Sequence, residues 1–130
     1  MDTRTIIEYW IKGAEEDYET AQLLFSGARY AHALFFCHLT IEKTLKALVV
    51  KNTGEHAPYD HSLTRLLELT GLERSPEQLK NLIEINSFNL KGRYDDYKFH
   101  FYEKATKEYT KKYFEEVDKL FLWLKEQLTK

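Results

Sequence analysis

The sequence predicts an all-α protein, an antiparallel four-helix up-and-down bundle with one additional short helix. The stretch 28–51 is apolar on almost every face in its first half, which is typical of a helix that other helices enclose. Residues 105–128 repeat apolar side chains at a helical period. No segment shows the alternation expected of a strand. The sequence therefore indicates helices packed around a central helix.

The first helix should begin near Thr3 or Thr5, because Thr5 and Glu8 have the spacing of a capping box, and Gly27 should end it. The central helix over 28–51 follows after a very short connection, so the two helices should be antiparallel. Residues 53–60 contain glycine and proline without periodicity and predict a loop.

A short helix should start at Leu63 and stop at Gly71. Ser75 and Pro76, followed by Gln78, form a strong start signal for the next helix. Residues 87–102 show no clean period and are dense in aromatic and charged side chains, which predicts an irregular segment with a function. The last helix should run from about residue 105 to residue 128.

Length and composition predict a single domain over residues 1–130. No apolar run approaches the roughly 18 residues that cross a bilayer, and the N-terminus lacks a signal pattern, so we expect a cytoplasmic protein without a membrane partner. The one cysteine, Cys37, lies among apolar residues and should be a core residue. Neither redox chemistry nor secretion is indicated.

The net charge of −2 argues against general coating of nucleic acid, but the charge is uneven. Residues 91–112 hold seven Lys or Arg against four Asp or Glu, and this excess should attract an anion. A solvated helix face with alternating charges would give the same count.

Several classes of site are missing from the sequence. There is no Glu-x-x-His pair of a di-iron bundle, no glycine-rich phosphate loop and no pair of cysteines. We therefore expect no metal site and no cofactor. Three polar residues of the central helix, His38, Glu42 and Lys46, are spaced four apart and should form one stripe that faces solvent or a partner.

An ordered set of residues spans nearly the whole chain: Trp10, Ala14, Asp17, Ala21, Tyr30, Ala33, Phe36, Glu42, Lys43, Lys46, Ala47, His61, Leu63, Arg93 and Tyr94. With this set the sequence resembles the HEPN domain family. The pattern of that family has an aromatic-Ala-x-x-x-aromatic start, a Glu-Lys-x-x-Lys-Ala core, a His-x-Leu element and an Arg-Tyr turn.

The resemblance implies a helical bundle that forms a homodimer, often beside a minimal nucleotidyltransferase in toxin–antitoxin-like pairs. The stretch 93–97 looks like the Arg-Tyr-Pro-Asp turn of the branch thought to bind nucleotides. We expect a nucleotide- or RNA-linked binding module, whose ligand-binding residues would be Lys43, Lys46, His61, Arg93, Tyr94, Asp96 and Tyr97. The two lysines could equally be solvated, His61 could cap the short helix, and the aromatic residues could cover the core.

Two alternatives remain open. Catalytic members of the family are metal-independent ribonucleases with an Arg four to six residues before a His, and six residues separate Arg93 from His100. Arg93 would hold the scissile phosphate and His100 would transfer a proton. Because Tyr94 departs from the catalytic pattern, we favour binding without catalysis. The third possibility is a helical module whose only role is dimerisation.

Overall fold

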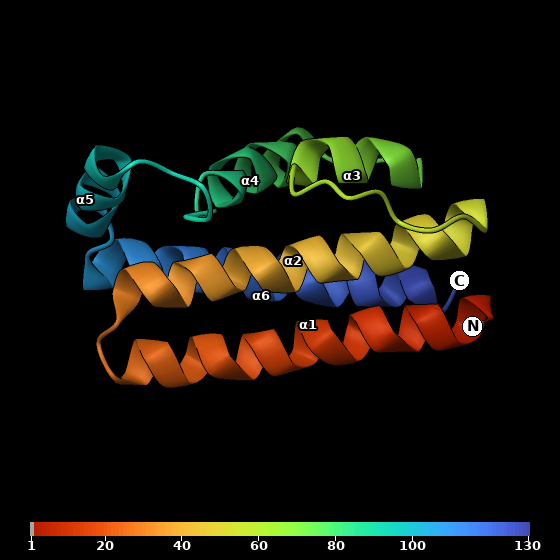
Figure 1. The fold of residues 1–130 in the computed structure, drawn as a ribbon, viewed down its shortest axis with the longest axis horizontal. Helices are drawn as coiled ribbons and strands as arrows, with labels where there is room; N and C mark the ends of the chain where they lie inside the picture. The colour runs from red at the N-terminus through yellow and green to blue at the C-terminus, as the bar shows by residue number, and fades with distance from the viewer. Residues whose placement is uncertain (1) are drawn as a thin grey trace.

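The computed structural model describes residues 2–130 and contains six helices but no strand in that range (Figure 1). The helices are α1 (Thr3–Ser26), α2 (Tyr30–Thr53), α3 (Leu63–Thr70), α4 (Pro76–Asn86), α5 (Asp95–Lys104) and α6 (Lys107–Leu128). The predicted all-α bundle is confirmed, with one helix more than expected.

The four longer helices alternate in direction along the chain. α1 and α2 form an antiparallel pair, α4 runs back along α2, and α6 packs along α2 (Figure 1). The short α3 lies beside α4, and together they cover the side of α2 that faces away from α1. α5 closes one end of the bundle.

α2 is the central helix, as its composition predicts. It contacts α1, α6, α3, α4 and α5. Its apolar side chains Leu34, Cys37, Ile41, Leu45 and Leu48 are fully buried. Burial of this many large apolar groups is the main source of stability in a bundle of this size.

Local signals set most helix ends. α4 carries the full predicted capping box, in which Ser75 and Gln78 each satisfy a backbone N–H of the other. Gly71 ends α3 with a φ of 72°, a conformation that glycine adopts without a steric penalty. α1 begins at Thr3, and its N-cap is Asp2, whose carboxylate accepts from the Thr5 N–H at 2.8 Å.

The prediction of an irregular segment over 87–102 is wrong in its second half, because α5 begins at Asp95. Asp95 and Asp96 lie in the first turn, where negative charge favours a helix. Only Phe101 of this helix is buried, so no apolar stripe at a helical period exists to be recognised. Periodicity cannot reveal a short helix that buries only one residue.

No helix within residues 2–130 combines the length and the apolar character that a membrane span requires.

Candidate functional site

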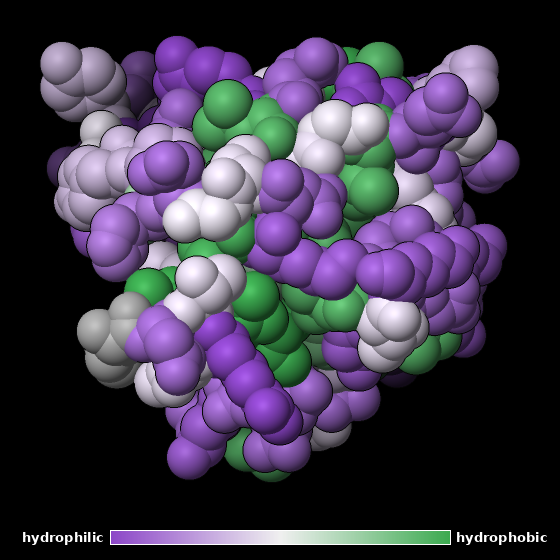
Figure 2. Space-filling view, turned by 90° about the vertical axis from the view of Figure 1, so that its right-hand side faces the viewer, coloured by the Kyte–Doolittle hydropathy of each residue, from purple (hydrophilic) through white to green (hydrophobic). Residues whose placement is uncertain are grey.

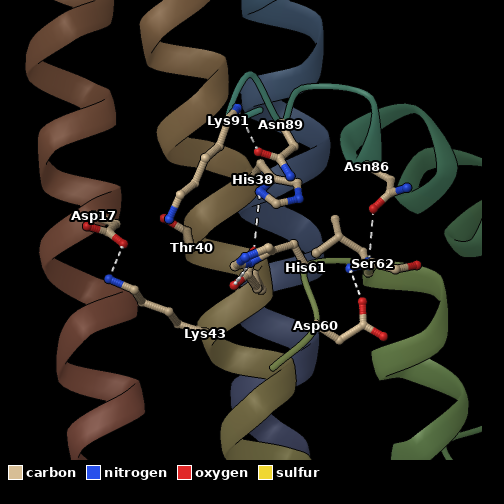
Figure 3. Close-up of polar contacts among 12 residues, drawn as sticks. Asp17, His38, Thr40, Lys43, Asp60, His61, Ser62, Asn86, Asn89 and Lys91 are labelled. Atoms are coloured by element: carbon tan, nitrogen blue, oxygen red, sulfur yellow. Dashed lines mark hydrogen bonds and ion pairs between the residues drawn. The ribbon is translucent and has the colours of Figure 1, made fainter. Parts of the chain in front are cut away.

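The polar stripe of α2 is buried, and the prediction that it faces solvent or a partner is wrong. The side chains of His38, Glu42 and Lys46 are 0%, 6% and 6% exposed. The loop between α2 and α3 runs back over α2 and brings His61 against the stripe (Figures 1 and 3). A contact between residues so distant in sequence cannot be inferred from helical spacing.

Glu42 lies at the centre of this buried group. Its Oε2 atom is 3.1 Å from Nζ of Lys46 and 3.0 Å from Nδ1 of His61. Its Oε1 atom lies 3.7 Å from Nδ1 of His38, which is too long for a hydrogen bond. Nζ of Lys46 also lies 5.2 Å from the ring centroid of Trp10 on α1. The carboxylate is therefore held in place by a cation that is itself buried.

His38 is fully buried, and neither of its ring nitrogens has a hydrogen-bond partner. Burial lowers the pKa of His38 to about 4, although the nearby Glu42 carboxylate acts in the opposite direction. The imidazole is therefore neutral at pH 7.

This burial predicts that the protein loses stability in mild acid. Unfolded His38, with a pKa of 6.5, takes up a proton that the folded protein does not bind until the pH reaches about 4. As the pH falls from 6.5 to 4, this residue alone should remove up to about 3 kcal/mol from the free energy of unfolding. Urea unfolding of the wild type and of His38→Leu at several pH values measures the effect. The free energy of unfolding should fall more steeply with decreasing pH in the wild type than in the variant. Equal slopes in the two proteins would contradict this prediction.

An open pocket of about 350 Å³ lies beside His61, and we call it the α3 pocket. It lies between the loop before α3, the end of α4 and the segment that leads to α5. Its lining residues are Tyr59, Asp60, His61, Ser62, Arg65, Asn86, Asn89 and Arg93.

Two asparagines supply hydrogen-bond donors to this region. Oδ1 of Asn86 accepts from the Leu63 N–H at 2.9 Å, and Oδ1 of Asn89 accepts from the Lys91 N–H at 3.1 Å (Figure 3). Each amide oxygen is thus used by the backbone. The Nδ2 groups remain as donors for a ligand.

Arg93 is fixed at one edge of the α3 pocket. Its Nε donates to the Asn89 carbonyl at 3.2 Å, and its guanidinium lies 4.6 Å from the ring centroid of Tyr97. Tyr97 is anchored in turn, because its hydroxyl donates to the Ser87 carbonyl. These contacts leave the two terminal nitrogens of Arg93 as donors, in the geometry that suits a phosphate.

The one carboxylate in the lining, Asp60, is already paired. It accepts from the Ser62 N–H at 2.9 Å and lies 2.9 Å from the Arg65 guanidinium. The Ser62 N–H and the Arg65 charge hold the pKa of Asp60 below its usual range. Arg93 therefore supplies a positive charge that no carboxylate of the lining cancels, beside donors from Asn86 and Asn89.

The structure brings together some of the predicted ligand residues and separates others. His61 and Arg93 line the same pocket, and the ring of Tyr97 packs against the Arg93 guanidinium. Lys46 is linked to His61 by Glu42, whose Oε2 atom contacts both side chains. Lys43 instead pairs with Asp17 of α1 at 2.7 Å (Figure 3).

Three further predicted residues lie on or next to α5. Tyr94 is its exposed N-cap and Asp96 is in its first turn. His100 lies 3.6 Å from Glu103 and does not line the α3 pocket. Arg93 precedes α5, so the helix does not carry both members of the proposed ribonuclease pair. Their joint role stays a prediction.

Six lining residues were not predicted from the sequence: Tyr59, Asp60, Ser62, Arg65, Asn86 and Asn89. The only local signal was two asparagines, Asn86 as the last residue of α4 and Asn89 in the segment that follows it, since asparagine side chains often bond to the backbone. Within residues 2–130 no three His, Cys, Asp or Glu side chains are grouped so that they could hold a metal ion.

A second pocket has a different chemistry. Figure 2 shows the end of the bundle with both termini, where hydrophobic residues lie in the centre of the face between hydrophilic ones. Near this end a pocket of about 230 Å³ is lined by Ile6, Tyr9, Trp10, His56 and Ala57. It lacks the cluster of donors that the α3 pocket offers.

Comparison with known proteins identifies relatives of this fold. The HEPN domain model matches residues 7–127. The crystal structure of TT1696 from Thermus thermophilus has a TM-score of 0.77 and 19% identity, over 92% of this chain and 96% of that one. ST0689, an archaeal HEPN homologue, has a TM-score of 0.71 and 25% identity, over 93% of this chain and 96% of that one. No curated protein sequence matches the chain significantly.

Proposed function

The chain belongs to the HEPN domain family, and from that premise we propose that it binds a nucleotide or RNA through a phosphate group in the α3 pocket. Arg93 would contact the phosphate through its terminal nitrogens, in the same pocket that His61 lines.

The single observation that supports this proposal is the surplus of donors over acceptors in the lining. The side-chain oxygen of Asn86 and that of Asn89 each accept a hydrogen bond from a backbone N–H. The Asp60 carboxylate already accepts from the Ser62 N–H and pairs with the Arg65 guanidinium. Arg93 keeps its terminal nitrogens. A ligand rich in acceptors and negative charge fits such a lining, and a phosphate has both properties.

Calorimetry with ATP and with a short single-stranded RNA tests the proposal. Arg93→Ala should weaken binding about 10- to 100-fold, because a hydrogen bond to a charged group contributes about 1.5–3 kcal/mol. Binding should also weaken at higher salt.

Arg4→Ala is the matched control, because it removes the same charge from an exposed pair with Glu8 on α1. This variant should bind the ligand with an affinity within about twofold of the wild type. An exposed charge outside the site affects binding only through a long-range interaction that salt screens. If the wild type and Arg93→Ala bind the ligand with equal affinity, the proposal that the ligand binds in the α3 pocket is contradicted.

We also propose that the protein is a homodimer that acts with a minimal nucleotidyltransferase in a toxin–antitoxin-like pair. Membership of the family supports both parts of this proposal. Purification from the native host under gentle conditions, followed by mass spectrometry, would identify such a partner.

The dimer gives a direct prediction. Light scattering at micromolar concentration should report about twice the chain mass of 15.5 kDa. A mass of one chain across the same concentration range would contradict it.

The third possibility, a module for dimerisation alone, needs no ligand. A dimer that binds neither ATP nor RNA would favour it.

A further inference from the structure

Tyr59 is a large aromatic side chain that the fold leaves almost entirely in solvent. Its exposed fraction is 90%, and it is one of the residues that line the α3 pocket. At this exposure the ring buries little apolar area, so it contributes little to the stability of the fold. A single exposed tyrosine needs no explanation in itself, but this ring lies beside the donors of a pocket. It is therefore available to a ligand.

The backbone around Tyr59 is held in a tight turn. The Asp60 N–H donates to the Pro58 carbonyl at 2.9 Å, which makes Tyr59 the central residue of a three-residue turn. The Asp60 carboxylate in turn accepts from the Ser62 N–H at 2.9 Å. The ring of Pro58 restricts its own φ as well. The backbone position of Tyr59 is therefore fixed relative to the pocket, although its side chain is exposed.

The ring of Tyr59 also rests against a residue that is anchored in the core. Its centroid lies 5.3 Å from the centroid of the His61 ring, with 68° between the ring planes, which is an edge-to-face contact. His61 is held by the buried Glu42 carboxylate, which lies 3.0 Å from Nδ1. Because Tyr59 is 90% exposed, this contact leaves at least one face of its ring uncovered. A ring that is held in place and open on one face is suited to stacking.

The pocket thus offers two kinds of surface. Apart from Tyr59 and the imidazole of His61, its lining consists of polar and charged side chains. The neighbouring ring of Tyr97 is covered by the Arg93 guanidinium, 4.6 Å from its centroid, and Tyr94 lies outside the lining. A nucleotide has the two matching parts, a negatively charged phosphate and a flat base. Inorganic phosphate and polyphosphate have only the first.

Resting on the function proposed above, we propose that Tyr59 is a specificity-determining residue of the α3 pocket, on which the base of a nucleotide stacks while Arg93 holds its phosphate. The pocket then selects a nucleotide over inorganic phosphate or polyphosphate. Stacking on an aromatic ring tolerates every base, because each base has a π face. The presence of a base should therefore matter more than its identity.

Calorimetry with ATP and with inorganic triphosphate, both without magnesium, tests the role of the base. The two ligands share a chain of three phosphates, and only ATP carries a base. Tyr59→Ala should weaken ATP binding about 5- to 100-fold and leave the affinity for triphosphate within about twofold of the wild type. Tyr59→Phe keeps the ring and should retain the affinity for ATP.

Tyr9→Ala is the matched control, because Tyr9 is a tyrosine of α1 that is 67% exposed and lies outside the lining of the α3 pocket. It should leave the affinities for both ligands within about twofold of the wild type. NMR of the wild type gives a second readout. The ring protons of Tyr59 should shift upfield with ATP, because a stacked base places them in its ring current, and triphosphate should cause no such shift.

Each failure has a separate meaning. If Tyr59→Ala binds ATP as tightly as the wild type, or loses affinity for ATP and triphosphate equally, this inference is overturned and the proposed phosphate site stands. Absence of the upfield shift with saturating ATP would overturn it as well, and this measurement does not depend on the stability of any variant. If the wild type binds neither ligand, the proposed function itself is overturned, and this inference with it.

Discussion

Glu42→Leu should lower the free energy of unfolding by about 3–5 kcal/mol, because it leaves Lys46 as a buried charge without its partner. The Lys46 side chain is only 6% exposed, and its ammonium has Glu42 as its ion-pair partner. Guanidinium unfolding of the wild type and the variant measures the difference. Loss of the contact to His61 should contribute a smaller part of the same effect.

The double variant Glu42→Leu with Lys46→Met separates the cost of a buried charge from general disruption of the core. It removes both charges and keeps similar volume, so it should recover much of the lost stability. Glu8→Leu is the exposed control, since its pair with Arg4 is 67–89% exposed, and it should change stability by less than about 1 kcal/mol. A double variant as unstable as Glu42→Leu would contradict this explanation.

Phe88→Ala should lower the free energy of unfolding by about 3–5 kcal/mol, the usual range for removing a fully buried phenylalanine. The ring packs against Phe101 of α5 and against Tyr109 and Tyr113 of α6. It therefore anchors the segment between α4 and α5 that carries Asn89 and Arg93. Ligand binding in the α3 pocket should weaken as well, because these donors lose their fixed positions.

Phe99→Ala on α5 is the matched control, because this ring is 60% exposed. Thermal unfolding should show a large fall in melting temperature for Phe88→Ala and a small change for Phe99→Ala. Similar changes in both would mean that the segment is held by contacts other than those of Phe88.

Much of the fold follows from local signals in the sequence. The capping box at Ser75 and the glycine at Gly71 place helix ends within one residue, because both act through backbone geometry near to them in the chain. The central position of α2 follows from the apolar residues on almost all its faces. α5 was missed because its first turn is polar and only Phe101 packs inward.

The candidate site could be predicted only in part. His61 and Arg93 were selected by resemblance, but their shared pocket depends on the path of the loop before α3 and of the segment after α4. The same is true of Glu42, which the sequence shows as one residue of a polar stripe and of the family's Glu-Lys-x-x-Lys-Ala core, but not as a partner of His61. Its partner His61 reaches it through a loop, and helical spacing carries no information on such contacts.

Binding of a phosphate group in the α3 pocket is tested most directly by two-dimensional NMR of the labelled protein titrated with ATP. We expect the side-chain amide signals of Asn86 and Asn89 and the ring signals of His61 to shift together and to saturate. The indole N–H signal of Trp10, which lines the pocket near the two termini, should not shift. Saturating shifts at Trp10 with unchanged signals from Asn86, Asn89 and His61 would contradict the claim.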